Sequence, residues 1–224
     1  MPADLVFLHT SPVHVSRFTQ LLQQADPDRA AAHVVDEALL ADAQHQGADA
    51  PAIVQRVHAA MQAAAAAHAA RLVVCTCSTI GGAAERTPTG GRFEAMRIDR
   101  AMADRAVRRG PRLLLVAALR STLAPTRELI DESARALGVD VQPTEHLVAG
   151  AWPLFERGDT AAYLQTAAAS VRQAMAAAAP QGFSAVVLAQ ASMAEAVPLL
   201  ADLGTEVLAS PPLGVQAIVA ALRR

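Results

Sequence analysis

Short apolar runs alternate with longer, alanine-rich segments along the whole of this 224-residue chain. The runs hold mostly aliphatic residues, many of them β-branched, which is typical of strands buried in parallel sheets. The segments between them repeat apolar residues at helical spacing. Strands that alternate with helices predict an α/β fold with parallel sheets and right-handed crossovers. Strands are expected at 5–8, 32–35, 71–76, 113–117, 139–141, 185–189 and 206–209, and helices at 13–24, 51–69, 94–108, 125–137, 160–178, 194–203 and from 213 to the end.

The run at 71–76 is followed by a small polar loop, where ligands bind in open α/β sheets. Cys77, Ser78 and Thr79 come directly after this strand, and a glycine pair at 81–82 frees backbone N–H groups. A thiol, two hydroxyls and backbone N–H groups suit a small anionic ligand and a reactive sulfur. Free cysteines are more often buried and inert, and Cys75, inside the apolar run, fits that interpretation. Cys77 fits it less well, because its strand is ending there.

The two halves of the chain repeat one pattern, a strand followed by a hydroxyl-bearing loop. Leu72–Thr79 corresponds to Leu188 with the loop 190–192, and Leu8–Thr10 corresponds to Leu119–Thr122. This correspondence predicts two similar α/β lobes that face each other across a cleft. One continuous doubly wound sheet is the alternative.

Composition excludes several classes of protein. The formal charge of −2 argues against a general nucleic-acid surface, and two cysteines one residue apart provide no disulfide framework. A Cys-x-Cys pair supplies too few ligands for a metal site, so none is expected. No segment has the length of a membrane span, and the first apolar run is too short for a signal peptide. A cytoplasmic protein with no membrane partner is expected.

Three segments resemble the aspartate/glutamate/hydantoin racemase superfamily, which also includes maleate isomerases and arylmalonate decarboxylases. They are Val73–Thr79, Ser121–Thr126 and Val187–Met193. The resemblance covers nearly the whole chain and implies two flavodoxin-like lobes, related by a pseudo-twofold axis, with the active-site cleft between them. It also implies that the carboxyl-terminal segment completes the first lobe. The expected lobes are therefore 1–97 with 207–224, and 98–206.

The resemblance implies chemistry without a cofactor at the carbon next to a carboxylate of a small amino acid or dicarboxylic acid. In this family one cysteine works on each face of the reacting carbon, as base and as acid. Cys77 matches the first family cysteine, and a homodimer is a further implication. The positions implied for substrate binding are Thr10, Ser78, Thr79, Ser121, Thr122, Gln190, Ala191 and Ser192.

The second family cysteine falls at Gln190, and no cysteine follows Cys77. A glutamine amide forms hydrogen bonds but does not transfer protons at neutral pH. Three outcomes stay open: Cys77 acts alone on one face, a histidine supplies the second proton, or the protein binds a small carboxylate without turnover. His9, at a strand end, is the first histidine to consider, followed by His14 and His146. The leading prediction is a racemase-like isomerase or a decarboxylase-like lyase, and the alternative is a non-catalytic binding or regulatory protein.

Overall fold

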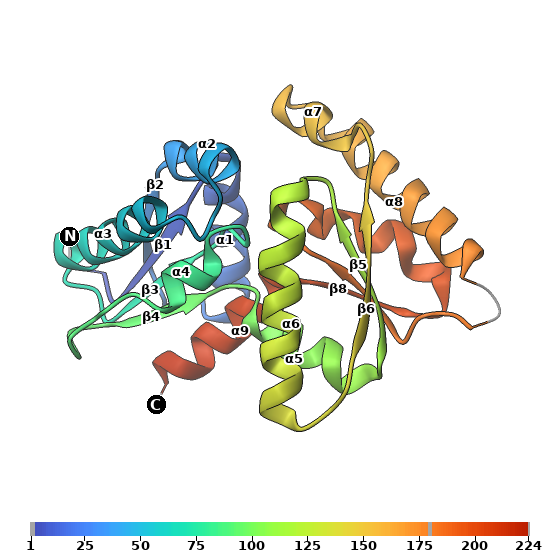
Figure 1. The fold of residues 1–224 in the computed structure, drawn as a ribbon. Helices are drawn as coiled ribbons and strands as arrows, with labels where there is room; N and C mark the ends of the chain where they lie inside the picture. Colours follow the sequence, from blue (N-terminus) through green and yellow to red (C-terminus); the bar gives the residue numbers. More distant parts are fainter. Residues whose placement is uncertain (1–2, 179–180, 224) are drawn as a thin grey trace. The chain divides into compact units, whose positions relative to one another are not determined.

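A computed structural model describes residues 3–178 and 181–223 of the chain. Within these residues the strands form two four-stranded parallel sheets of like order, β2-β1-β3-β4 and β6-β5-β7-β8 (Figure 1). The chain divides into two compact units. One holds the described residues up to Asp99 together with those from Pro211 onward, and the other is Arg100–Ser210. The predicted α/β fold of two similar lobes is confirmed, and the alternative of one continuous sheet is wrong.

The first unit is built on strands that are buried on both faces. β1 (Leu5–His9) pairs with β2 (Ala31–Val35) and with β3 (Leu72–Cys75), and β4 (Glu94–Arg97) pairs with β3. All described side chains of β1 and β3 are buried, which explains why their sequences are apolar without alternation. The helices of this unit are α1 (Val13–Ala25), α2 (Glu37–Gln46), α3 (Pro51–His68), α4 (Gly81–Glu85) and α9 (Ser210–Leu222).

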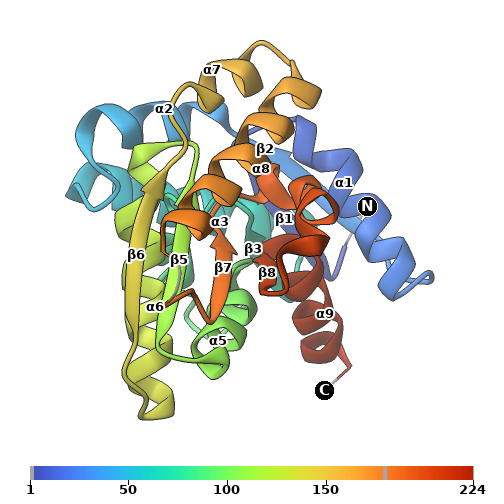
Figure 2. The ribbon, with the colours of Figure 1, turned by 90° about the vertical axis from the view of Figure 1, so that its right-hand side faces the viewer.

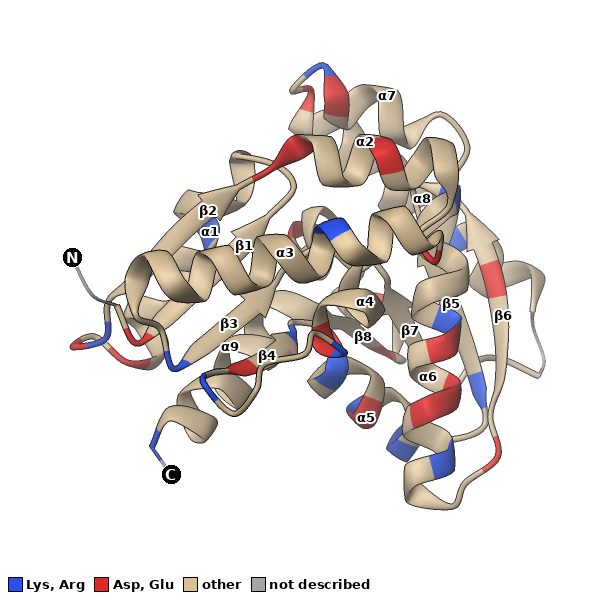
Figure 3. Ribbon diagram, turned by 60° about the vertical axis from the view of Figure 1, so that its left-hand side comes forward, with Lys and Arg blue, Asp and Glu red and all other residues tan. Residues whose placement is uncertain are grey.

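Helix α3 covers one face of the first sheet. Its proline stands at the first turn, where the missing N–H costs nothing. Ile53, Val57 and Met61 recur every fourth residue, so they form one stripe that packs into the core with strand residues such as Val73. Arg56 is the single Lys, Arg, Asp or Glu of this helix, and α3 is accordingly almost uncoloured in Figure 3.

The second unit repeats this plan. Figure 2 shows its four strands side by side, with β5 and β7 in the middle and β6 and β8 at the edges. β5 and β7 are almost completely buried, as β1 and β3 are. The strands are β5 (Arg112–Ala117), β6 (Gln142–Leu147), β7 (Ala185–Leu188) and β8 (Glu206–Ala209); the helices are α5 (Arg100–Arg109), α6 (Leu123–Leu137), α7 (Ala151–Glu156) and α8 (Thr160–Ala177), with 3₁₀ segments η1 (Arg120–Thr122), η2 (Ala191–Ala196) and η3 (Pro198–Leu203).

The segment 94–108 was predicted as one helix, and this prediction is wrong. Its first four residues form the edge strand β4, and α5 starts only at Arg100. β4 is polar and partly exposed because its outer edge has no partner strand among the described residues. The strand at 206–209 also lies elsewhere than expected: it pairs with β7 in the second unit, whereas its residues from 207 onward were assigned to the first lobe.

Two further differences concern the second unit. The strand expected at 139–141 is β6, at 142–147, which carries a proline, a glutamate and a histidine and therefore shows no apolar run. A proline is compatible with an edge strand. The segment 194–203, predicted as a helix, consists of the 3₁₀ segments η2 and η3.

Replacing Gly214 with alanine is expected to lower the free energy of unfolding by about 1–3 kcal/mol, the usual cost of overpacking. A Cβ at this position of α9 would lie 2.2 Å from the backbone oxygen of Ile98, which is too close for any real contact. Urea unfolding measures the change. Gln216→Ala, on the exposed side of the same helix, is the control and is expected to change stability little. Equal stability of the two variants would contradict this packing.

Candidate functional site

The loop after β3 places Cys77 among hydrogen-bond donors. The Thr10 hydroxyl, from the loop after β1, and the Thr79 hydroxyl both reach the sulfur, as do the backbone groups of Thr79 and Ile80. β1 and β3 are neighbours in the sheet, so the residues that follow them meet at its carboxyl edge. Burial raises the pKa of the Cys77 thiol, and these hydrogen bonds act in the opposite direction. Cys77 is therefore a thiol at rest, with donors in place that stabilise a thiolate when it forms.

The two cysteines differ in environment. Cys75 is buried in the core of the first unit, and burial raises its pKa strongly. Its Sγ lies 3.6 Å from the backbone oxygen of Cys77. Cys77 remains partly exposed, so it is the cysteine that a small molecule can reach.

A buried ion pair that was not predicted from the sequence supports the same loop. Arg97 is the last residue of β4 and Asp99 follows two residues later, and their side chains are 3% and 1% exposed. Arg97 donates through Nε to Asp99 Oδ1 (2.6 Å) and through a second nitrogen to Asp99 Oδ2 (3.1 Å), and it reaches the backbone oxygen of Ser78 at 3.4 Å. Its guanidinium lies against Gly81, where an added Cβ would be 2.9 Å from Nε. The pair thus joins the end of β4 to the loop that carries Cys77.

Burial acts to raise the pKa of Asp99, but the charge and hydrogen bonds of Arg97 outweigh it, and the pKa lies below its usual value. Ser78 also contributes to this lowering, although its Oγ, which is buried, makes no hydrogen bond of acceptable geometry within the described residues. Ser78, which directly follows Cys77 in this loop, thus lies next to the ion pair.

His9, expected as a second acid, is completely buried. Its Nδ1 lies 2.8 Å from Thr76 Oγ1 and its Nε2 lies 2.8 Å from His33 Nδ1. His33 Nε2 in turn lies 3.1 Å from Thr19 Oγ1. Burial lowers the pKa of His9 to about 3, with smaller contributions from His33 and His14. The catalytic role of His9 stays a prediction, and the structure adds the contacts through which this residue would act.

Acidification below about pH 6 is expected to destabilise the protein. The pKa values of His9 and His14 are lowered to about 3 and about 4, mainly by burial. The unfolded chain therefore binds protons at a higher pH than the folded chain does. The contribution of the two neutral histidines to the free energy of unfolding is fully present above the ordinary histidine pKa. It is lost as the pH falls toward their pKa values in the folded protein. Each histidine contributes a slope of about 1.4 kcal/mol per pH unit within this window.

Urea unfolding between neutral pH and about pH 5, above the main carboxylate titrations, measures this slope. His14→Leu is expected to reduce the slope. His45→Leu, an exposed histidine on α2, is expected to leave it unchanged. A free energy of unfolding that does not vary over this range would contradict the assignment of neutral, buried histidines.

In the second unit the predicted residues meet at the carboxyl ends of β5 and β7. Gln190 is buried, and its Oε1 accepts hydrogen bonds from the backbone N–H groups of Ala118 (2.6 Å) and Leu119 (3.0 Å). Its side chain therefore joins the loop after β7 to the loop that carries Ser121 and Thr122. The oxygen is used within the unit, so the amide N–H groups are what this side chain can offer a ligand.

The hydroxyls near Gln190 have different surroundings. Thr122 is buried at the start of α6, whereas the buried Oγ of Ser121 has no hydrogen-bond partner within the described residues. Ser192 lies 2.8 Å from the hydroxyl of Tyr163, whose pKa burial raises to about 12. Ala191 is buried beside them. The substrate contacts expected of these residues stay predictions.

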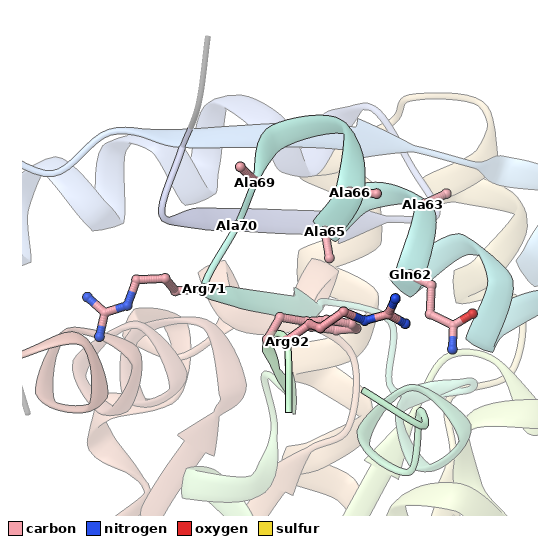
Figure 4. A pocket seen from close by; sticks show the side chains of 9 residues that line it. Gln62, Ala63, Ala65, Ala66, Ala69, Ala70, Arg71 and Arg92 are labelled. Atoms are coloured by element: carbon pink, nitrogen blue, oxygen red, sulfur yellow. The ribbon is translucent and has the colours of Figure 1, made fainter. Parts of the chain in front are cut away.

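A surface hollow of about 570 Å³ lies at the opposite end of β3 (Figure 4). Alanines of α3 line it together with Gln62, Arg71, Arg92 and Phe93. Arg71 directly precedes β3 and Cys77 follows that strand, so the hollow and the cysteine lie at opposite edges of the sheet. The hollow is therefore separate from the candidate site.

Residues 3–178 and 181–223 contain no group of three or more His, Cys, Asp or Glu side chains placed to hold a metal ion. No helix in the same part of the chain is long and apolar enough to cross a membrane.

Two parallel α/β units of like strand order, with a cysteine loop at the carboxyl edge of the first, define a class of fold. The chain has the same fold as solved glutamate, aspartate and allantoin racemases. Glutamate racemase from Thermus thermophilus, solved with β-chloro-D-alanine, is 17% identical, with a TM-score of 0.68 over 99% of this chain and 80% of that one. No family model and no curated protein sequence matches the chain.

Other solved structures give the same result. A putative Asp/Glu racemase from Yersinia pestis is 13% identical, with a TM-score of 0.70 over 99% of this chain and 100% of that one. Allantoin racemase from Pseudomonas fluorescens is 15% identical, with a TM-score of 0.59 over 98% and 90%. The fold is therefore shared at nearly full length, although the sequences have diverged widely.

Proposed function

We propose that the protein is a racemase-like isomerase that transfers a proton at the carbon next to a carboxylate of a small amino acid or dicarboxylic acid, with Cys77 as acid and base. The observation that carries this proposal is the set of donors around the Cys77 sulfur, from Thr10, Thr79 and Ile80. Structural neighbours that are glutamate and allantoin racemases support it.

The surroundings of Cys77 suit this chemistry in a specific way. The thiol is neutral at rest, so a thiolate must form when substrate binds or during the reaction. Donors that are fixed before the reaction stabilise that charge at little reorganisation cost. The thiol first loses its own proton to solvent. The thiolate then takes the proton from the α-carbon, the electron pair of the C–H bond moves toward the substrate carboxylate, and the thiol returns a proton to the carbon. Return on the same face exchanges the hydrogen and retains the configuration, so isomerisation needs a second acid on the other face, the role predicted for His9. The reaction needs no cofactor in this scheme.

A raised thiol pKa also suits the donation of a proton to a carbanion. A decarboxylase-like lyase needs this step: the C–C bond to the leaving carboxylate breaks, CO₂ departs with neither bonding electron, and Cys77 protonates the carbon that retains the pair. This reaction is a variant of the same proposal, since it uses the same atom of Cys77. The contribution of Gln190 and the other residues of the second unit stays a prediction from the resemblance.

Alkylation of Cys77 tests the site before any substrate is known. Iodoacetamide modification, followed by mass spectrometry, is expected to slow in the presence of those small carboxylates that the site accepts, and not with the corresponding uncharged amides. A carboxylate site at Cys77 would be contradicted if no acid in a broad panel of amino, hydroxy and dicarboxylic acids slows the modification.

The rival proposal is a non-catalytic protein that binds a small carboxylate on the same fold. The buried Gln190, in the position of the second family cysteine, favours it, because an amide cannot replace a thiol in proton transfer. Carboxylates that protect Cys77, bind equally well to Cys77→Ser and lose no α-hydrogen would establish this rival.

A further inference from the structure

A continuous row of hydrogen bonds crosses the first unit beside the Cys77 loop. It joins α1 to the ends of β1, β2 and β3, and none of its members was identified from the sequence except His9. We call it the histidine row. In order it consists of Val15 O, Thr19 Oγ1, His33 Nε2 and Nδ1, His9 Nε2 and Nδ1, Thr76 Oγ1 and Leu8 O, with successive separations of 2.8, 3.1, 2.8, 2.8 and 3.2 Å.

The histidine row holds fewer hydrogens than it has contacts. Both ends are backbone carbonyl oxygens, which only accept hydrogen bonds. Five contacts each require one hydrogen. Two hydroxyls and two neutral imidazoles supply one hydrogen each along the row, which makes four. One contact therefore always lacks its hydrogen while both histidines are neutral.

Two neutral arrangements keep the contact between the histidines. In the first, both carry their hydrogen on Nδ1: His33 donates to His9, His9 donates to Thr76, and Thr76 donates to the Leu8 carbonyl, while Thr19 turns from Val15 to donate to His33. In the second, both carry it on Nε2: His9 donates to His33, His33 donates to Thr19, and Thr76 turns to donate to His9. Opposite tautomers would leave two bare nitrogens, or two N–H groups, facing each other at 2.8 Å.

We propose that His9 and His33 change tautomer together, so that the Thr76 hydroxyl alternates between the Leu8 carbonyl and His9. The change passes through a state with one additional proton, in which all five contacts are made. Solvent supplies this proton to His33 Nε2, and the proton between the rings moves from His33 Nδ1 to His9 Nε2. His9 Nδ1 then passes its proton to Thr76 Oγ1, which releases its own hydrogen to solvent and is left donating to His9. One proton is taken up and one is returned, so the net charge of the row does not change.

The surroundings keep the additional-proton state short-lived at neutral pH. Burial lowers the pKa of both histidines of the row. His14 lies in α1 with its ring centroid 6.4 Å from that of His9, and Arg17 lies in the same helix. Two further titratable groups follow strands that carry the row. Cys77 follows β3, and Asp36 follows β2 and donates its backbone N–H to the His9 oxygen. The neutral tautomers are therefore the populated states.

The histidine row also bears on the candidate site, and this part of the inference rests on the proposed function. Thr76 and His9 directly precede Cys77 and Thr10, and the Thr10 hydroxyl bonds the Cys77 sulfur. The contact of Thr76 with Leu8 joins the two strand ends from which this pair extends. Thr76, His9 and His33 are thus positioning residues for Cys77.

Two matched substitutions separate the arrangements, because valine has the shape of threonine without its hydroxyl. In Thr19→Val three contacts of the histidine row and three hydrogens remain. All three contacts are made only when both histidines are in the Nδ1–H form. In Thr76→Val the remaining contacts fit only with both in the Nε2–H form. Nitrogen-15 NMR of the imidazole side chains measures the tautomers, with His45→Gln as a control that leaves both signals unchanged.

The expected result is a shift of His9 and His33 together, in opposite directions in the two variants. Opposite tautomers on the two rings, or the same tautomer pair in both variants, would overturn the proposal. Should Thr76→Val not fold, Thr19→Val alone still tests the proposal, since Thr19 is a partly exposed helix residue. Both histidines in the Nε2–H form in Thr19→Val would contradict the proposal.

The link to Cys77 has its own measurement, which needs no substrate. Thr76→Val is expected to change the iodoacetamide rate of Cys77 by about three- to tenfold, the size of one hydrogen bond, and Thr19→Val is expected to change it less. Equal rates in the two variants, with the tautomer shifts present, would overturn the positioning role and leave the coupled tautomers standing.

Discussion

Replacing Asp99 with asparagine is expected to lower the free energy of unfolding by about 3–5 kcal/mol, the cost of breaking a buried ion pair on one side. Both partners are almost completely buried, and the guanidinium of Arg97 would keep its charge with no carboxylate opposite it. The substitution preserves shape, so loss of packing does not contribute. The effect is expected to decrease in acid, as Asp99 of the natural protein is protonated below its lowered pKa.

Urea unfolding at neutral pH measures the loss. Asp131→Asn is the matched control, because its partner Arg127 and Asp131 itself are 38% and 44% exposed. Such pairs contribute about 0–1 kcal/mol. The double variant Arg97→Met with Asp99→Asn is expected to recover part of the loss, since it removes the unpaired charge. A loss for Asp99→Asn no larger than that for Asp131→Asn would show that the pair is not buried as described.

Replacing Cys77 with serine is expected to lower the rate of α-hydrogen exchange by about 10²–10⁴-fold, the contribution of a positioned acid–base group. The serine hydroxyl keeps the hydrogen-bond partners and nearly the size of the thiol. Its far higher pKa prevents it from taking a proton from carbon at neutral pH. Carboxylate binding, measured by calorimetry, is expected to change little.

Cys75→Ala is the control for this substitution. Cys75 is buried two residues earlier, with a strongly raised pKa, and the proposal gives it no chemical role. The variant is expected to exchange α-hydrogens at the natural rate, although it loses some stability from the cavity. Equal losses of exchange in the two variants would indicate a structural effect of the loop rather than chemistry at Cys77.

The alternation of apolar runs and helical segments predicted the fold because buried parallel strands have a distinct composition. β1, β3, β5 and β7 are the inner strands of the two sheets, and each was found within a residue or two of its observed range. The edge strands β2 and β8 were found as well, whereas the edge strands β4 and β6 were misplaced because their sequences are polar. Local pattern gives no signal where burial does not dictate residue type.

The candidate site was predictable where residues adjoin a strand end. Cys77 and Thr10 follow β3 and β1, and adjacency of these strands brings them together. The pair of Arg97 and Asp99 was missed with its strand, although the sequence Arg-x-Asp at a strand end is a signal that could have been used. His33 and Thr19 were not predictable, because their contacts join residues far apart in the chain through side-chain geometry.

The most direct test of the central proposal is proton exchange in D₂O, followed by proton NMR, over a panel of amino, hydroxy and dicarboxylic acids with the natural protein and Cys77→Ser side by side. The account predicts that a small carboxylate loses its α-hydrogen signal with the natural protein and retains it with the variant. Retained chirality would indicate chemistry on one face by Cys77 alone. A panel in which no acid exchanges or loses CO₂, or in which exchange is equally fast without the thiol, would contradict the account.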